Sequence, residues 1–95
     1  VDFYPIEVNS QDAFSLSIIG SQTSWINDPP VNNSSIRLKR NDGVTISAIN
    51  FIVLSNTLII ADFEGSTYGH YDIEVYDENI LDWISISGFE IIPSE

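Results

Sequence analysis

Polar and apolar residues alternate along most of the chain with a period of two, which is typical of β-strands that bury one face. Phe14, Leu16 and Ile18 are separated by single serines and give the clearest example. Successive side chains of a strand point to opposite sides, so these three residues predict one buried face. No stretch of ten or more residues has the apolar spacing of a helix, and the pattern therefore predicts an all-β chain.

Seven segments show this alternation, and turn-forming residues separate them. They are residues 1–8, 14–18, 36–39, 44–53, 57–63, 71–76 and 81–92. Short strands at this spacing are typical of a two-sheet antiparallel immunoglobulin-like β-sandwich of about seven strands. We expect one core, made by Phe14, Leu16, Ile18, Ile36, Leu38, Ile59, Phe63, Tyr71, Ile73, Val75, Phe89 and Ile91.

Three irregularities interrupt the alternation. Pro5 lies inside the segment 1–8, and it predicts an edge strand because proline cannot donate to a strand ladder. The alternation slips by one residue at 48–49 and again at 87–88. We expect a β-bulge at Gly88, because an extra residue there would keep the apolar side chains before and after it on one face.

The same parity argument singles out two aliphatic residues as a candidate interaction surface. Leu58 and Ile60 fall on the opposite face of their strand from Ile59, Ala61 and Phe63. Large aliphatic side chains cost roughly 25 cal/mol per Å² to leave in water. We therefore interpret Leu58 and Ile60 as the best candidates for a surface that meets a neighbouring domain or a second copy of the chain.

Length and charge narrow the classes of partner. The 95 residues fit a single domain, residues 1–95, which we expect to have been taken from a larger multidomain protein. Fourteen acidic and three basic residues give a net charge of −11. Nucleic acids and anionic membranes are disfavoured because both are bound through Lys and Arg. No apolar stretch reaches the roughly 18 residues of a membrane span, so we expect no direct membrane insertion.

Catalysis finds little support in the residues. His70 is the only histidine, and with Tyr71 in the core it shares the outer face with Asp72. A strand surface offers no oxyanion hole for a Ser–His–Asp mechanism, and the chain has no G-x-S-x-G segment. We expect that the protein is not an enzyme.

One acidic turn is a candidate calcium site. Asp77, Glu78, Asn79 and Asp82 cluster there and offer the hard oxygen ligands that calcium prefers. The spacing matches no EF-hand, and a solvated acidic turn explains it equally well. The chain has no cysteine and one histidine, which disfavours zinc. We expect no cofactor, and the sequence leaves open whether this turn binds calcium.

Basic and aromatic side chains each permit two interpretations. All three basic residues of the chain lie close together, at Arg37, Lys39 and Arg40. One interpretation is that they pair with acidic residues on a neighbouring strand and protect a sheet edge. The other is that they form a docking patch for an acidic partner. Trp83 is opposite in parity to its apolar neighbours, and we expect it to lie across a hairpin from Tyr76. The two rings predict either a cross-strand contact or an exposed platform on which sugars stack.

Four segments carry motifs of a known domain family, in the family's order. They are SIIGSQTSW at 17–25, SNTLI at 55–59, GHYDIEV at 69–75 and GFEI at 88–91. They resemble the I-x-G-x-x-[TF], S-x-T-x-I, G-x-Y-D-V-x-V and G-F-x-V segments of IPT/TIG-type immunoglobulin-like domains. The resemblance implies a seven-stranded sandwich that serves as a module in bacterial secreted and surface proteins. It implies no catalytic residues.

Together these features predict a non-catalytic immunoglobulin-like spacer or interaction module of a secreted or cell-surface protein. The alternative is a carbohydrate-binding module that uses exposed aromatic side chains. The expected partners are neighbouring domains of the same polypeptide, another protein or a glycan, and the expected location is extracellular or at the cell surface. The candidate interaction surface consists of Leu58, Ile60, Tyr76 and Trp83.

Overall fold

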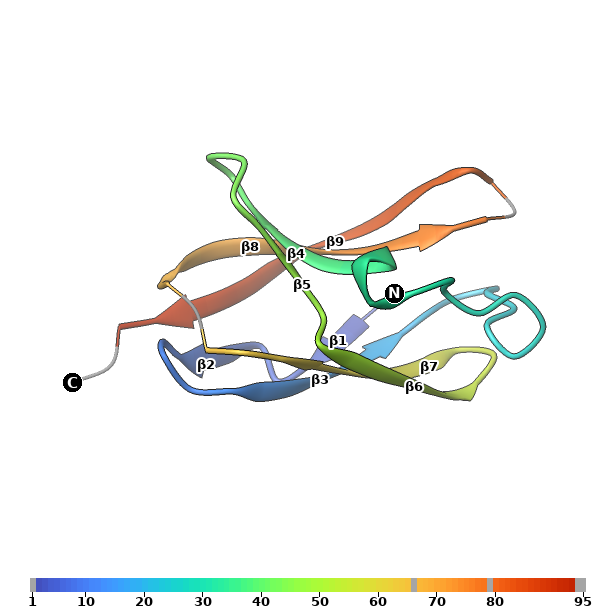
Figure 1. Cartoon of the computed structure of the whole chain (residues 1–95), viewed down its shortest axis with the longest axis horizontal. Coiled ribbons are helices and arrows are strands. Elements are labelled where there is room, and N and C mark those ends of the chain that lie inside the picture. The colour runs from blue at the N-terminus through green and yellow to red at the C-terminus, as the bar shows by residue number, and fades with distance from the viewer. Residues whose placement is uncertain (1, 66, 79, 94–95) are drawn as a thin grey trace.

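The chain folds into two facing β-sheets (Figure 1), as shown by a computed structural model that describes residues 2–65, 67–78 and 80–93. Sheet A consists, in spatial order, of β1 (Asp2–Tyr4), β3 (Phe14–Ile19), β7 (Leu58–Phe63) and β6 (Asn50–Ser55). Sheet B consists of β2 (Glu7–Asn9), β9 (Asp82–Ile92), β8 (Gly69–Asp77), β4 (Ile36–Arg40) and β5 (Thr45–Ser47). Within the described residues, the one helix is the short 3₁₀ turn η1 (Asn33–Ser35).

The prediction of an all-β, two-sheet domain is confirmed, but two details of it are wrong. The described chain forms nine strands rather than about seven, and β2 pairs with β9 in parallel. Both extra strands arise where a predicted strand crosses from one sheet to the other. Residues 1–8 divide at Pro5 into β1 and β2, and residues 44–53 divide at 48–49 into β5 and β6.

These two crossings join the sheets along both sides of the sandwich. β1 and β6 are the edge strands of sheet A, while β2 and β5 are the edge strands of sheet B. The slip in the alternation at 48–49 marks one crossing, because a strand that changes sheets must turn its other face to the core. Pro5 marks the other, because it interrupts the ladder.

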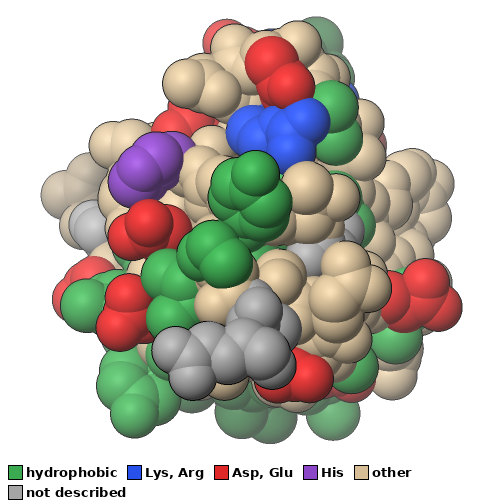
Figure 2. All heavy atoms as spheres, turned by 90° about the vertical axis from the view of Figure 1, so that its left-hand side faces the viewer, with side chains coloured by type: hydrophobic (Ala, Val, Ile, Leu, Met, Phe, Trp, Pro, Cys, Tyr) green, Lys and Arg blue, Asp and Glu red, His purple; other side chains and the backbone are tan. Residues whose placement is uncertain are grey.

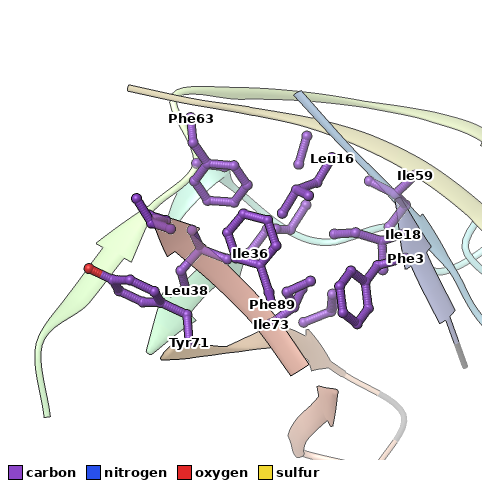
Figure 3. Close-up of a cluster of buried hydrophobic side chains, with 14 of the residues drawn as sticks. Phe3, Leu16, Ile18, Ile36, Leu38, Ile59, Phe63, Tyr71, Ile73 and Phe89 are labelled. Carbon is purple, nitrogen blue, oxygen red and sulfur yellow. The ribbon is translucent and has the colours of Figure 1, made fainter. Parts of the chain in front are cut away.

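The predicted core is confirmed. Side chains from both sheets meet between them (Figure 3), and every predicted core residue is buried except Phe14, which packs against the others while partly exposed. The core also contains Phe3, Trp25, Ala48 and Ala61. The Phe89 ring of sheet B lies edge-on to Phe3 at 6.2 Å and at 5.5 Å from Phe14, both in sheet A.

The predicted bulge at Gly88 is also confirmed. Tyr71 and Ile73 of β8 lie opposite Phe89 and Ile86 of β9, so β9 carries one extra residue between these pairs. Gly88 has a φ of 109°, which glycine adopts without the steric cost that a side chain would add. The extra residue keeps Ile86 and Phe89 on the side that faces sheet A.

The long connection after β3 is anchored by a buried tryptophan. Trp25 is 4% exposed, and its backbone N–H donates to the carbonyl oxygen of Asn56 at 3.3 Å. A side chain at Gly20 would place a Cβ within 2.9 Å of the Trp25 ring. Glycine is therefore required where the backbone passes the indole.

Candidate functional site

The outer face of sheet A carries the first pair of predicted site residues. In β7, Ile59, Ala61 and Phe63 are buried, whereas Leu58 and Ile60 point to the other side and are half-buried. The predicted parity of this strand is therefore confirmed. Whether Leu58 and Ile60 contact a partner stays a prediction.

The strand order surrounds these two residues with other apolar side chains. One row across sheet A contains Tyr4, Ser17, Ile60 and Ile52, and the next contains Ile19 beside Leu58. The exposed fractions are 72% for Tyr4, 43% for Ile19, 57% for Ile52 and 55% for Leu54. We call this set of Tyr4, Ile19, Ile52, Leu54, Leu58 and Ile60 the apolar face.

An extended surface of this kind differs from singly exposed apolar residues, which are ordinary. Contiguous apolar patches on a soluble domain mark interaction sites. The sequence analysis found only the central pair. The alternation in residues 49–53 is a signal that could have placed Ile52 outside, but Tyr4 joins the face only through the pairing of β1 with β3.

The charged groups around the apolar face are acidic. Asp2 lies beside Ile19 at one end of the sheet, and Asp62 accepts a hydrogen bond from the Ser15 hydroxyl at 2.5 Å towards the other end. All three basic residues of the chain belong to β4 in sheet B. The face therefore combines an apolar centre with negative charge at its margins.

The second predicted pair lies on the outer face of sheet B. Tyr76 and Trp83 are opposite each other across the β8–β9 hairpin, as expected, and both are half-buried. Their rings meet edge to face, with centroids 5.3 Å apart and planes at 75°. The structure therefore does not bring the four predicted site residues together, because Leu58 and Ile60 belong to the other sheet.

Arg37 covers one side of the Trp83 ring. Its guanidinium carbon lies 3.8 Å from the ring centroid, and its Nε donates to a carboxylate oxygen of Glu74 at 2.6 Å. Glu74 is 8% exposed, so the ion pair satisfies a largely buried carboxylate. A sugar-binding platform needs a free, flat aromatic surface. Here the Arg37 guanidinium occupies one face of the Trp83 ring, and the Tyr76 ring is nearly perpendicular to it.

The predicted structural role of the basic residues had two parts, of which one is confirmed and the other is wrong. Arg37 lies opposite Glu74 and Lys39 opposite Asp72, which is the predicted cross-strand arrangement. The predicted protection of a sheet edge is wrong, because β4 lies between β8 and β5. The hairpin turn around Gly43 brings β5 back along β4, and β5 forms the edge instead.

Arg40 and Asp42 form a tight pair at the end of this hairpin. The Nε and Nη2 atoms of Arg40 donate to the two carboxylate oxygens of Asp42 at 2.8 and 2.7 Å. Basic and acidic side chains adjoin each other on the end of the molecule that faces the viewer in Figure 2. The hydrogen bonds from Arg40 hold the pKa of Asp42 at about 2, below its ordinary value of 3.8.

This pairing predicts a pH-dependent contribution to folding. The pKa of Asp42 is lower in the folded chain, so the ionised carboxylate stabilises the fold above its ordinary pKa of 3.8, and this contribution is lost as the pH falls towards about 2. A carboxyl NMR titration should give a midpoint near 2 for Asp42. In Arg40→Gln the midpoint should move back towards 3.8. An unchanged midpoint in that variant would contradict the assigned cause.

The remaining candidates are scattered over the surface. His70 is exposed, as predicted, with Nε2 3.9 Å from a Glu90 carboxylate oxygen. Asp77 and Asp82 lie opposite each other where the β8–β9 hairpin closes, and Asn79 lies outside the described residues. Among the described residues, no three His, Cys, Asp or Glu side chains lie together in a group that could hold a metal ion. In the same part of the chain, no helix has the length and hydropathy to cross a membrane.

Neither protein-family models, nor curated proteins, nor solved structures give a match to this chain.

Proposed function

We propose that this chain is a non-catalytic, immunoglobulin-like interaction module of a secreted or cell-surface protein. In this proposal the apolar face of sheet A docks against a neighbouring domain of the same polypeptide. The observation that carries the proposal is the run of exposed aliphatic and aromatic side chains across the strands of sheet A, with half-buried Leu58 and Ile60 at its centre. Packing of a second apolar surface against such a face is favourable, because it removes apolar area from water.

The proposed kinship with IPT/TIG-type domains draws its support from where the resembling segments fall. Residues 17–25 contain the end of β3 and the glycine beside the buried Trp25. Residues 55–59 form the turn that leads into β7. Residues 69–75 lie in β8, and residues 88–91 begin at the β9 bulge. Each segment thus supplies a turn or a strand of the two-sheet fold.

Carbohydrate binding is the alternative that the sequence left open. The geometry of the predicted platform does not favour it, because Tyr76 and Trp83 meet at 75° and Arg37 covers one indole face. A glycan-array screen of the domain tests the alternative directly.

The proposed docking face is tested by the double substitution Leu58→Ser with Ile60→Ser. A fully buried aliphatic residue contributes about 1.5–3 kcal/mol, and both side chains are half-buried, so we expect the two substitutions together to lower the free energy of unfolding by about 1.5–3 kcal/mol. In the polypeptide that carries this domain, the variant should expose the junction with the next domain to faster limited proteolysis. We therefore expect the variant domain to stay folded but to lose its contact with the neighbouring domain.

The matched control is Ile80→Ser with Leu81→Ser. It makes the same chemical change at two exposed residues near the end of the β8–β9 hairpin, away from the apolar face. The control should leave proteolysis at the junction unchanged. Equal proteolysis in both variants and in the parent protein would contradict docking through the apolar face. A loss of several kcal/mol in the isolated domain would place Leu58 and Ile60 in the core instead.

A further inference from the structure

The edge of sheet A at β6 is a second surface that could bind a partner, besides the apolar face. β6 is the last strand of its sheet, and within the described residues it pairs only with β7. A strand paired on one side leaves alternate backbone N–H and C=O groups pointing outwards, and these groups form a template for another strand. The opposite edge strand, β1, is shorter and is followed directly by Pro5.

Most features that normally protect an edge strand are missing from β6. Its sequence, Asn50–Ser55 (NFIVLS), contains no lysine, no proline and no charged residue. A register shift between Val53 and Ser55 interrupts the ladder at one end only. The remaining part, around the 57% exposed Ile52, is a regular and apolar edge of the kind that pairs with other chains.

The charge distribution indicates which chain fits this edge. No charged side chain occurs from Gly43 to Ala61, although the whole chain has a net charge of −11. Two copies repel each other across most of their surfaces, but along this strip no acidic side chains face each other. Antiparallel self-pairing centred on Ile52 places Ile52 beside its own copy and Phe51 beside Val53, so that outer and inner side chains stay on matching faces.

We propose that two copies of the chain pair antiparallel along β6 and join their sheets A into one continuous sheet. This inference goes beyond the proposed docking of a neighbouring domain, because it concerns backbone groups at the sheet edge rather than side chains on its face. An interface formed by one short strand from each copy lies at the small and weak end of the range. The dimer is therefore expected at protein concentrations of roughly 10–1,000 µM.

The experiment is sedimentation of the protein over that concentration range, at two salt concentrations. Screening shortens the electrostatic reach from about 30 Å at 0.01 M salt to about 8 Å at 0.15 M. Two acidic copies that meet at an uncharged edge should therefore associate more tightly at the higher salt concentration. Hydrogen exchange at the dimer concentration should show new protection in β6. A monomer at every concentration and salt level overturns the proposal.

Two matched variants separate edge pairing from stacking through the apolar face. Ile52→Lys places at the edge the charge that natural edge strands use to prevent pairing, and it should abolish the dimer. Ile19→Lys makes the same change on the same face of sheet A, but on β3, which lies between β1 and β7. It should leave the dimer intact. Loss of the dimer in both variants would indicate face stacking and overturn the edge proposal, whereas the docking face tested by Leu58 and Ile60 would stand.

Discussion

Replacement of Phe89 by alanine is expected to lower the free energy of unfolding by about 3–5 kcal/mol. Phe89 is fully buried, and its ring contacts Phe3 of β1 and Phe14 of β3. It therefore links β9 of sheet B to two strands of sheet A. A domain of 95 residues has a total stability of about 5–14 kcal/mol, so the loss of this one side chain removes a large part of it.

Urea denaturation measures this effect. The transition midpoint should fall while the slope of the transition stays unchanged, because the variant alters stability and not the surface exposed on unfolding. Tyr68→Ala is the control, since it also truncates an aromatic ring but at a side chain that is 60% exposed. Its effect should stay within about 0.5 kcal/mol. A loss below about 1 kcal/mol in Phe89→Ala would contradict the central position of this ring.

Much of the fold could be predicted because the alternation of polar and apolar residues is a local signal. It identified Phe89, Leu16 and most of the other core residues, since a sheet with one buried face repeats every two residues. The exchange of strands between sheets was not predicted. A slip at 48–49 shows that the chain turns its other face to the core, but the partner of each half depends on strands distant in sequence.

The candidate site likewise could be predicted where it depends on local alternation and could not where it depends on strand pairing. Parity within one strand placed Leu58 and Ile60 on the outer face. Tyr4 could not be assigned to that face, because its position depends on β1 pairing with β3 and not with β9. The contact of Arg37 with Trp83 likewise depends on the registers of β4, β8 and β9 together, although pairing of Arg37 with an acidic neighbour followed from the sequence. Local periodicity predicts faces, and non-local registers decide which residues share them.

The bulge in β9 predicts that one serine is dispensable and another is not. Deletion of Ser87 removes the extra residue, and Gly88 then lies directly opposite Asp72. The pairs Tyr71–Phe89 and Ile73–Ile86 are kept, and each apolar side chain stays on its face. We expect a loss of about 1 kcal/mol or less, which is the cost of a glycine in a regular strand.

Deletion of Ser85 changes the same strand by the same residue type, but it falls within a regular part of the ladder, where Ser85 lies opposite Glu74. Either Ile86 must then turn outwards, or Trp83 and Ile84 must exchange faces. Because a partly buried aliphatic side chain turns away from sheet A in either case, the free energy of unfolding should fall by about 1–2 kcal/mol, more than for the Ser87 deletion. Thermal or urea unfolding of the two deletion variants measures the difference. Equal losses would contradict a bulge at Gly88, since only an extra residue at that point makes Ser87 removable while Ser85 remains necessary for the register.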